Sequence, residues 1–144
     1  SDQPIVSERV MYWPDPVTAW SEAHSTLGVE SAGLHWGVAD GRKGMGPQYS
    51  TYLLLANPND AAVTVRVRFL RTSGAPIEKL FDVAARRRFN IDLNTAVPEL
   101  ADEVFSSEIT VMGNLPIVVE EALYWNALGV QWSGGAAIPA TRLP

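Results

Sequence analysis

The chain has 144 residues, of which 47% are hydrophobic and 19% charged, a composition typical of one globular domain and not of a disordered segment. The net charge of −5 argues against nucleic-acid binding, because a protein that neutralises phosphates needs a basic surface. The lack of cysteine excludes disulfides and thiolate metal sites, and no apolar run reaches the roughly 18 residues that a transmembrane helix needs.

Apolar residues recur at every second position along most of the chain, which predicts β-strands with one buried face. Residues 49–56 are rich in β-formers and nearly all apolar toward their end, which is typical of a central strand. The alternation continues in three further segments, residues 63–69, 88–94 and 108–111. Residues 57–60 and 72–76 contain the Asn, Asp, Pro and Gly residues that favour turns between these strands.

Helical periodicity is almost absent, and residues 95–103 are the one segment in which a single helical turn is expected. Nine to ten short strands separated by turns at this spacing predict an all-β fold. We therefore expect an antiparallel two-sheet sandwich, immunoglobulin-like or jelly-roll-like, with little or no helix.

Two distant segments of the sequence match each other. Residues 4–13 (PIVSERVMYW) and residues 116–125 (PIVVEEALYW) are identical at six of ten positions, at an offset of 116 − 4 = 112 residues. Each segment is followed by a Trp-Ser pair, Trp20-Ser21 and Trp132-Ser133, seven residues after its own first tryptophan. Agreement in both residues and spacing indicates an internal repeat, in which each copy is a strand, a short turn and a second strand.

This match suggests how the chain is organised. We interpret residues 1–31 as the closing hairpin of a preceding repeat and residues 32–144 as one complete repeat, together forming one compact domain. An isolated hairpin cannot bury both of its faces, so we expect it to pack on the main sandwich and add edge strands. Pairing with a neighbouring molecule is the alternative.

The segments at 116–126 (PIVVEEALYWN), 132–135 (WSGG) and 140–144 (ATRLP) resemble a β-sandwich repeat found at the C-terminus of large secreted or cell-surface bacterial proteins, a family of uncharacterised function. Residues 20–28 and 53–58 look like two further strands of that family. The resemblance implies an extracellular location, other domains of a parent protein as partners, and an end of the parent protein close to Pro144. It implies no activity.

Aromatic residues are the best candidates for ligand binding. Sugar-binding modules stack the apolar face of a pyranose on an exposed aromatic ring. The alternative is that the repeated tryptophans pack in the core or cover the hairpins. The candidate ligand-binding residues are Tyr12, Trp20, Trp36, Tyr124 and Trp132.

Glu8 and Glu120 occupy equivalent places in the two copies, on faces that are otherwise apolar. A carboxylate in such a place needs a partner, and we expect a structural ion pair with an arginine such as Arg66 or Arg68. A glycosidase-like carboxylate pair is the functional alternative, although Glu120 and Glu121 cannot form it because they point to opposite faces of a strand.

Glu22 and His24 share a strand face and are the weak candidates for a metal site, which usually needs three or four ligands. No nucleophile, phosphate-loop, zinc-protease or calcium-loop motif is present. We therefore expect no metal, no cofactor and no catalytic residues.

The sequence thus favours a non-catalytic extracellular module with a structural or interaction role, which could self-assemble through sheet edges. A carbohydrate-binding module is the alternative, and it requires at least two exposed Trp or Tyr rings. A small glycoside hydrolase is the third hypothesis. We expect the chain neither to bind nucleic acid nor to span a membrane.

Overall fold

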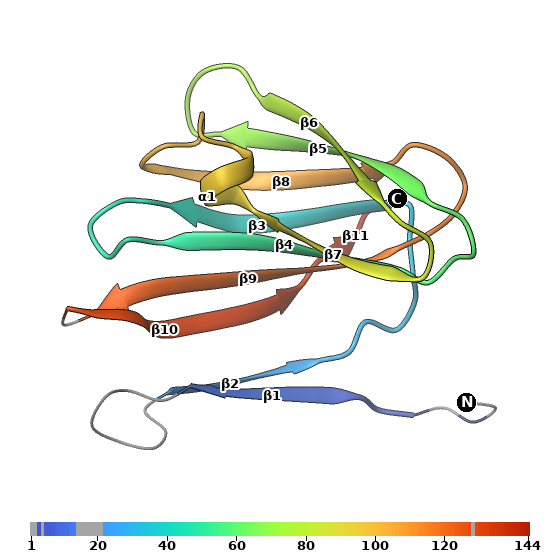
Figure 1. The fold of residues 1–144 in the computed structure, drawn as a ribbon, viewed down its shortest axis with the longest axis horizontal. Coiled ribbons are helices and arrows are strands. Elements are labelled where there is room, and N and C mark those ends of the chain that lie inside the picture. The colour runs from blue at the N-terminus through green and yellow to red at the C-terminus, as the bar shows by residue number, and fades with distance from the viewer. Residues whose placement is uncertain (1–2, 4, 14–21, 128) are drawn as a thin grey trace.

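The computed structural model describes residues 3, 5–13, 22–127 and 129–144, and these form almost wholly β-structure (Figure 1). Eleven strands and one short helix follow one another along this part of the chain: β1 (Glu8–Trp13), β2 (Glu22–Leu27), β3 (His35–Lys43), β4 (Ser50–Asn57), β5 (Val63–Arg71), β6 (Ile77–Val83), β7 (Arg87–Asp92), α1 (Leu93–Ala96), β8 (Glu103–Val111), β9 (Val118–Ala127), β10 (Val130–Pro139) and β11 (Thr141–Arg142).

Nine of these strands form two sheets that enclose a common core. The four-stranded sheet has the order β10-β9-β4-β7, and the five-stranded sheet has the order β11-β3-β8-β5-β6. Every pair of neighbouring strands is antiparallel. The expected all-β antiparallel sandwich is thus confirmed, with eleven described strands in place of nine to ten.

The core is built from the alternating apolar residues. In β5, Val63, Val65, Val67 and Phe69 are all buried, whereas the residues between them are partly exposed. Phe69 meets Phe105 of β8 edge to face, with the ring centroids 5.8 Å apart. Burying one such side chain stabilises the fold by about 1.5–3 kcal/mol, so the inner faces of these strands hold the two sheets together.

The turn after β4 is held by a buried side chain. Asn57 is 2% exposed, and its side-chain amide donates to the carbonyl oxygens of Ala61 (2.9 Å) and Val83 (3.1 Å). Its side-chain oxygen accepts from the backbone N–H of Asn59 at 3.0 Å. These bonds satisfy backbone groups that a turn leaves unpaired, which is why asparagine is favoured there.

The two matching sequence segments form hairpins with the same pairing register. In the first, Tyr12 pairs with Ala23 and β1 pairs with β2 throughout. In the second, Tyr124 pairs with Gly135, so both members of the pair are shifted by 112 residues (124 − 12 and 135 − 23). The two predicted strands are therefore present and paired in both places.

The first hairpin packs on its own sandwich, but it does not extend either sheet. β1 and β2 form a separate two-stranded sheet that lies beside β10 (Figure 1). His24 on β2 donates a hydrogen bond from Nε2 to the carbonyl oxygen of Ala137 on β10. Arg9 on β1 forms an ion pair with Glu120 on β9, with Nη1 and Oε2 3.0 Å apart. The expectation of added edge strands was therefore wrong.

Small residues beneath the hairpin explain this arrangement. Ala122 and Ala137 pair with each other on the outer face of the four-stranded sheet, yet they are only 3% and 2% exposed. Their short side chains let a second layer approach closely, so the hairpin covers the sheet rather than joining its edge. No helix in the described part of the chain is long and apolar enough to cross a bilayer.

Candidate functional site

A groove of about 890 Å³ lies between β1 of the hairpin and the outer face of the four-stranded sheet. This volume falls within the range of about 300–1,000 Å³ that small-molecule sites occupy. Its lining residues come from five strands: Arg9, Val10, Met11 and Tyr12 of β1, Tyr52 and Leu54 of β4, Arg88 and Asn90 of β7, Ala122 and Tyr124 of β9, and Gln131 and Trp132 of β10.

Strand pairing explains why these side chains share one face. Leu54 pairs with Asn90 on one side and Glu120 on the other, and Tyr52 pairs with Ala122. Paired residues in antiparallel strands point to the same side, and so do residues two apart along one strand. The floor of the groove is therefore formed by even-numbered residues of β4, β7 and β9, whereas the odd-numbered Leu53, Ile91 and Val119 on the other side are buried in the core.

Three aromatic residues of the groove form a continuous cluster. The ring centroids of Tyr124 and Trp132 are 5.9 Å apart, at an interplanar angle of 39°. Tyr52 meets Tyr124 nearly edge to face, also at 5.9 Å. Burial raises the pKa of Tyr52, with smaller contributions from Asp92 and Tyr124. Trp132 and Tyr12 are 46% and 58% exposed, so the groove presents aromatic surface to solvent.

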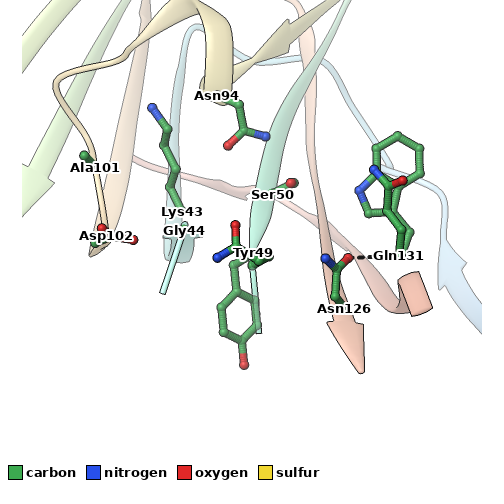
Figure 2. Close-up of a pocket in the computed structure, with 11 residues that line it drawn as sticks. Lys43, Gly44, Tyr49, Ser50, Asn94, Ala101, Asp102, Asn126 and Gln131 are labelled. Carbon is green, nitrogen blue, oxygen red and sulfur yellow. Dashed lines mark hydrogen bonds between the residues drawn. The ribbon is translucent and has the colours of Figure 1, made fainter. Parts of the chain in front are cut away.

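Trp132 is held in an unusual backbone conformation. Its φ of +53° is uncommon for any residue other than glycine, and it lies where the pairing of β9 and β10 is irregular. Figure 2 shows Asn126 of β9 directed toward the beginning of β10, where its Oδ1 accepts the backbone N–H of Trp132 at 2.8 Å. Such strained positions cluster at functional sites, because the surrounding structure must maintain them.

A smaller and more polar cavity adjoins the groove. It measures about 350 Å³ and shares Gln131 and Trp132 with the groove, so Trp132 stands between the two. Lys43 of β3 and Asn94 of α1 contribute to its walls. Lys43 is 8% exposed and donates from Nζ to the carbonyl oxygen of Val97 at 2.8 Å. Its burial lowers the pKa of its ammonium group.

The groove is also polar at its other end. Asn90 and Arg88 lie on β7, and both are exposed. Arg9 lines the groove from the hairpin, where its ion pair with Glu120 joins the two layers. The groove therefore combines aromatic rings with amide and guanidinium donors, a combination suited to a ligand with both apolar and polar faces.

Three of the five predicted ligand-binding residues meet in this groove, namely Tyr12, Tyr124 and Trp132. Trp36 does not, and its assignment was wrong. It is 1% exposed, belongs to the core and donates from Nε1 to the carbonyl oxygen of Gly33 at 3.1 Å, so no ligand can stack on it. Trp20 lies outside the described residues.

The predicted ion-pair residues have different partners from those expected. Glu120 pairs with Arg9. Arg68 pairs with Glu108 at 2.8 Å, on the five-stranded sheet. Glu8 is exposed at the start of β1, opposite Leu27. Nε of Arg66 is buried and has no hydrogen-bond partner among the described residues.

Glu108 also accepts a hydrogen bond from His35. Nε2 of His35 lies 2.9 Å from Oε1 of Glu108. This hydrogen bond and the charge of Arg68 lower the pKa of the Glu108 carboxyl. The carboxylate is thus a structural link between β3, β5 and β8 and lies away from the groove.

The weak metal candidates do not form a centre. Glu22 is exposed at the start of β2, whereas His24 uses its Nε2 to hold β10. Within the described part of the chain, no group of three or more His, Asp and Glu side chains could hold a metal ion.

Sequence reasoning missed Tyr52, Arg88, Asn90 and Gln131 as groove residues. The period-two pattern places Tyr52 opposite in direction to its buried neighbours Thr51 and Leu53, which was the available signal. It could not show that a hairpin 40 residues upstream would cover this face (52 − 12 = 40).

The sequence matches no family model, and no curated protein resembles it significantly. Several solved structures share its fold. The crystal structure of Thermotoga maritima 1070 has a TM-score of 0.67 at 14% identity, over 78% of this chain and 96% of that one. The Anabaena sensory rhodopsin transducer has a TM-score of 0.53 at 24% identity, over 65% of this chain and 91% of that one. At these identities the likeness defines a class of all-β sandwich and no more.

Proposed function

We propose that this chain is a non-catalytic carbohydrate-binding module, and that its ligand occupies the groove between β1 and the four-stranded sheet. The observation that carries the proposal is the cluster of Tyr12, Tyr52, Tyr124 and Trp132 around one open groove. The C–H face of a sugar ring packs on such aromatic surface, while its hydroxyl groups bond to polar side chains nearby. Asn90 and Gln131 supply those polar groups.

The lining of the groove supports binding rather than catalysis. Glycoside hydrolysis uses two carboxyl groups that flank the bond to be broken. The described residues that line the groove include no Asp or Glu. Glu120, beside the groove, is paired with Arg9. One neighbouring fold belongs to a protein named as a sensory rhodopsin transducer, which is compatible with a module that recognises a partner.

The test is calorimetric titration of the whole chain with neutral and acidic tetrasaccharides. We expect Trp132→Ala to weaken binding about tenfold or more, because a central aromatic residue carries much of the energy of a site. Met112→Ala is the matched control, since Met112 is 54% exposed and lies outside the groove. Equal affinities for the two variants would refute the location of the site in the groove. An absence of binding to every oligosaccharide tested would refute the carbohydrate-binding function.

A structural or interaction module is the second candidate, and a specific observation favours it. The N-terminal segment exposes three large apolar side chains, Ile5 (74% exposed), Val6 (89%) and Val10 (46%). Among the described strands, β1 pairs only with β2, so its other edge is free. A free strand edge next to apolar side chains favours pairing with a second copy of the chain. Sedimentation at high concentration tests this, and a monomer throughout would count against it. The extracellular location implied by the family resemblance stays a prediction.

A further inference from the structure

The charge of the groove differs from that of the whole protein. The chain carries a net charge of −5, yet the described residues that line the groove include two arginines, Arg9 and Arg88, and no acid. A basic groove on an acidic protein attracts anions by its local field. A ligand with a carboxylate gains more from this arrangement than a neutral sugar, because a hydrogen bond between two charged groups is the stronger one.

Arg88 is the cation that remains available. It is exposed on β7, and no ion pair or hydrogen bond of its side chain is found in the described part of the chain. Arg86, two residues earlier, differs from it because it pairs with Asp60. A guanidinium group with its fork unoccupied matches a carboxylate, which it can bind through two parallel hydrogen bonds.

The acids on the same face do not compete for Arg88. Glu120 is held by Arg9, with Nη1 and Oε2 3.0 Å apart. Asp92 caps α1, where its Oδ1 accepts the backbone N–H of Asn94 at 2.9 Å. Both carboxylates therefore have other partners, and the guanidinium group of Arg88 can pair with the carboxylate of a ligand.

The register of β4 and β7 gives the distance between the basic and the aromatic ends. Asp92 pairs with Tyr52, and Arg88 lies four residues back along β7. At about 3.3 Å per residue, the two ends are roughly 13 Å apart along the strands. This span exceeds one sugar ring, so a ligand that reaches both ends has at least two sugar units.

Building on the proposed carbohydrate site, we propose that its ligand is an acidic oligosaccharide, in which the carboxylate of a uronic acid unit pairs with Arg88 while a second ring stacks on the cluster of Tyr52, Tyr124 and Trp132. The aromatic end recognises the sugar ring and the basic end recognises its charge. Lengthening the ligand from one unit to two should therefore raise affinity sharply.

The experiment compares matched series on the whole chain by titration calorimetry. The neutral series contains monomers to tetramers of glucose, galactose and mannose, and the acidic series contains the corresponding uronic acids. We expect the acidic tetramers to bind about tenfold more tightly than their neutral counterparts at low salt, with the difference shrinking as salt is added. Arg88→Gln should abolish the difference in affinity between the acidic and neutral series.

Arg87→Gln is the control, because Arg87 is the adjacent exposed arginine on the opposite side of β7 and lies outside the groove. Equal affinity for the two series, or an acidic preference that survives Arg88→Gln, overturns the inference but leaves the carbohydrate site standing. No binding in either series refutes both. Thermal melting of each variant verifies that it is folded.

Discussion

Glu121 of β9 is wholly buried between the two sheets, and neither of its carboxylate oxygens has a hydrogen-bond partner in the described part of the chain. Burial raises the pKa of this carboxyl from 4.5 to about 8, and the negative charge of Asp40 adds to the effect. The folded protein therefore keeps this proton at neutral pH, whereas the unfolded chain releases it. Glu121→Gln replaces the group with one of similar shape that has no proton to lose.

The sign of the effect follows from proton binding. Between pH 4.5 and about 8 the folded state binds one proton more than the unfolded state at this residue, so the free energy of unfolding falls as pH rises. The slope is about 1.4 kcal/mol per pH unit. Over the difference 8 − 4.5 = 3.5 the loss reaches roughly 5 kcal/mol, of which about 3 kcal/mol is lost by pH 7.

The assay is urea unfolding of both proteins at half-unit steps from pH 4.5 to 9. We expect the wild-type free energy of unfolding to decline relative to that of Glu121→Gln up to about pH 8 and to run parallel above it. Asp40→Asn should end the decline at a lower pH, because it removes the second cause of the raised pKa. Parallel curves for wild type and Glu121→Gln over the whole range would refute the reasoning.

Three further outcomes are expected. Gly134→Ala should lower stability by about 1–3 kcal/mol, because a new Cβ would lie 2.4 Å from the Trp125 ring; an unchanged melting temperature would contradict this. Glu108→Gln should destabilise the protein at neutral pH, since the hydrogen bond from His35 lowers the pKa of the native carboxyl. The stabilisation by the ionised Glu108 carboxylate is present above pH 4.5 and is lost as the pH falls through the lowered pKa. A Glu108→Gln variant that remained less stable than the wild type in strong acid would count against this explanation. His24→Ala removes the bond from β2 to Ala137, and it should speed amide hydrogen exchange in β2 while leaving β5 protected; equal protection of β2 in both proteins would argue against that anchor.

Local patterns predicted the strands well, because side-chain alternation is a property of the extended backbone itself. Val63, Val65, Val67 and Phe69 could be assigned to one buried face from their spacing, and the structure buries all four. The helical turn was expected at residues 95–103, but it spans Leu93–Ala96, since Asp92 caps it earlier. Boundaries of this kind depend on a single capping contact.

The candidate site was predicted only in part. Tyr12, Tyr124 and Trp132 could be selected from the repeat, and they do meet in one groove. Trp36 was selected on residue type alone and is buried. Alternation shows which residues share a face of a strand, but it does not show whether that face meets the other sheet, the hairpin or water.

By itself, the sequence determined the strands, the turns and the pairing within each hairpin, because these depend on neighbouring residues and on side-chain alternation. Only the tertiary structure decided that β1 lies over the outer face of the four-stranded sheet, where Arg9 meets Glu120. That contact joins residues 111 positions apart, and it depends on how closely two layers can approach across Ala122 and Ala137. The groove exists because of this packing between layers, which no local pattern specifies.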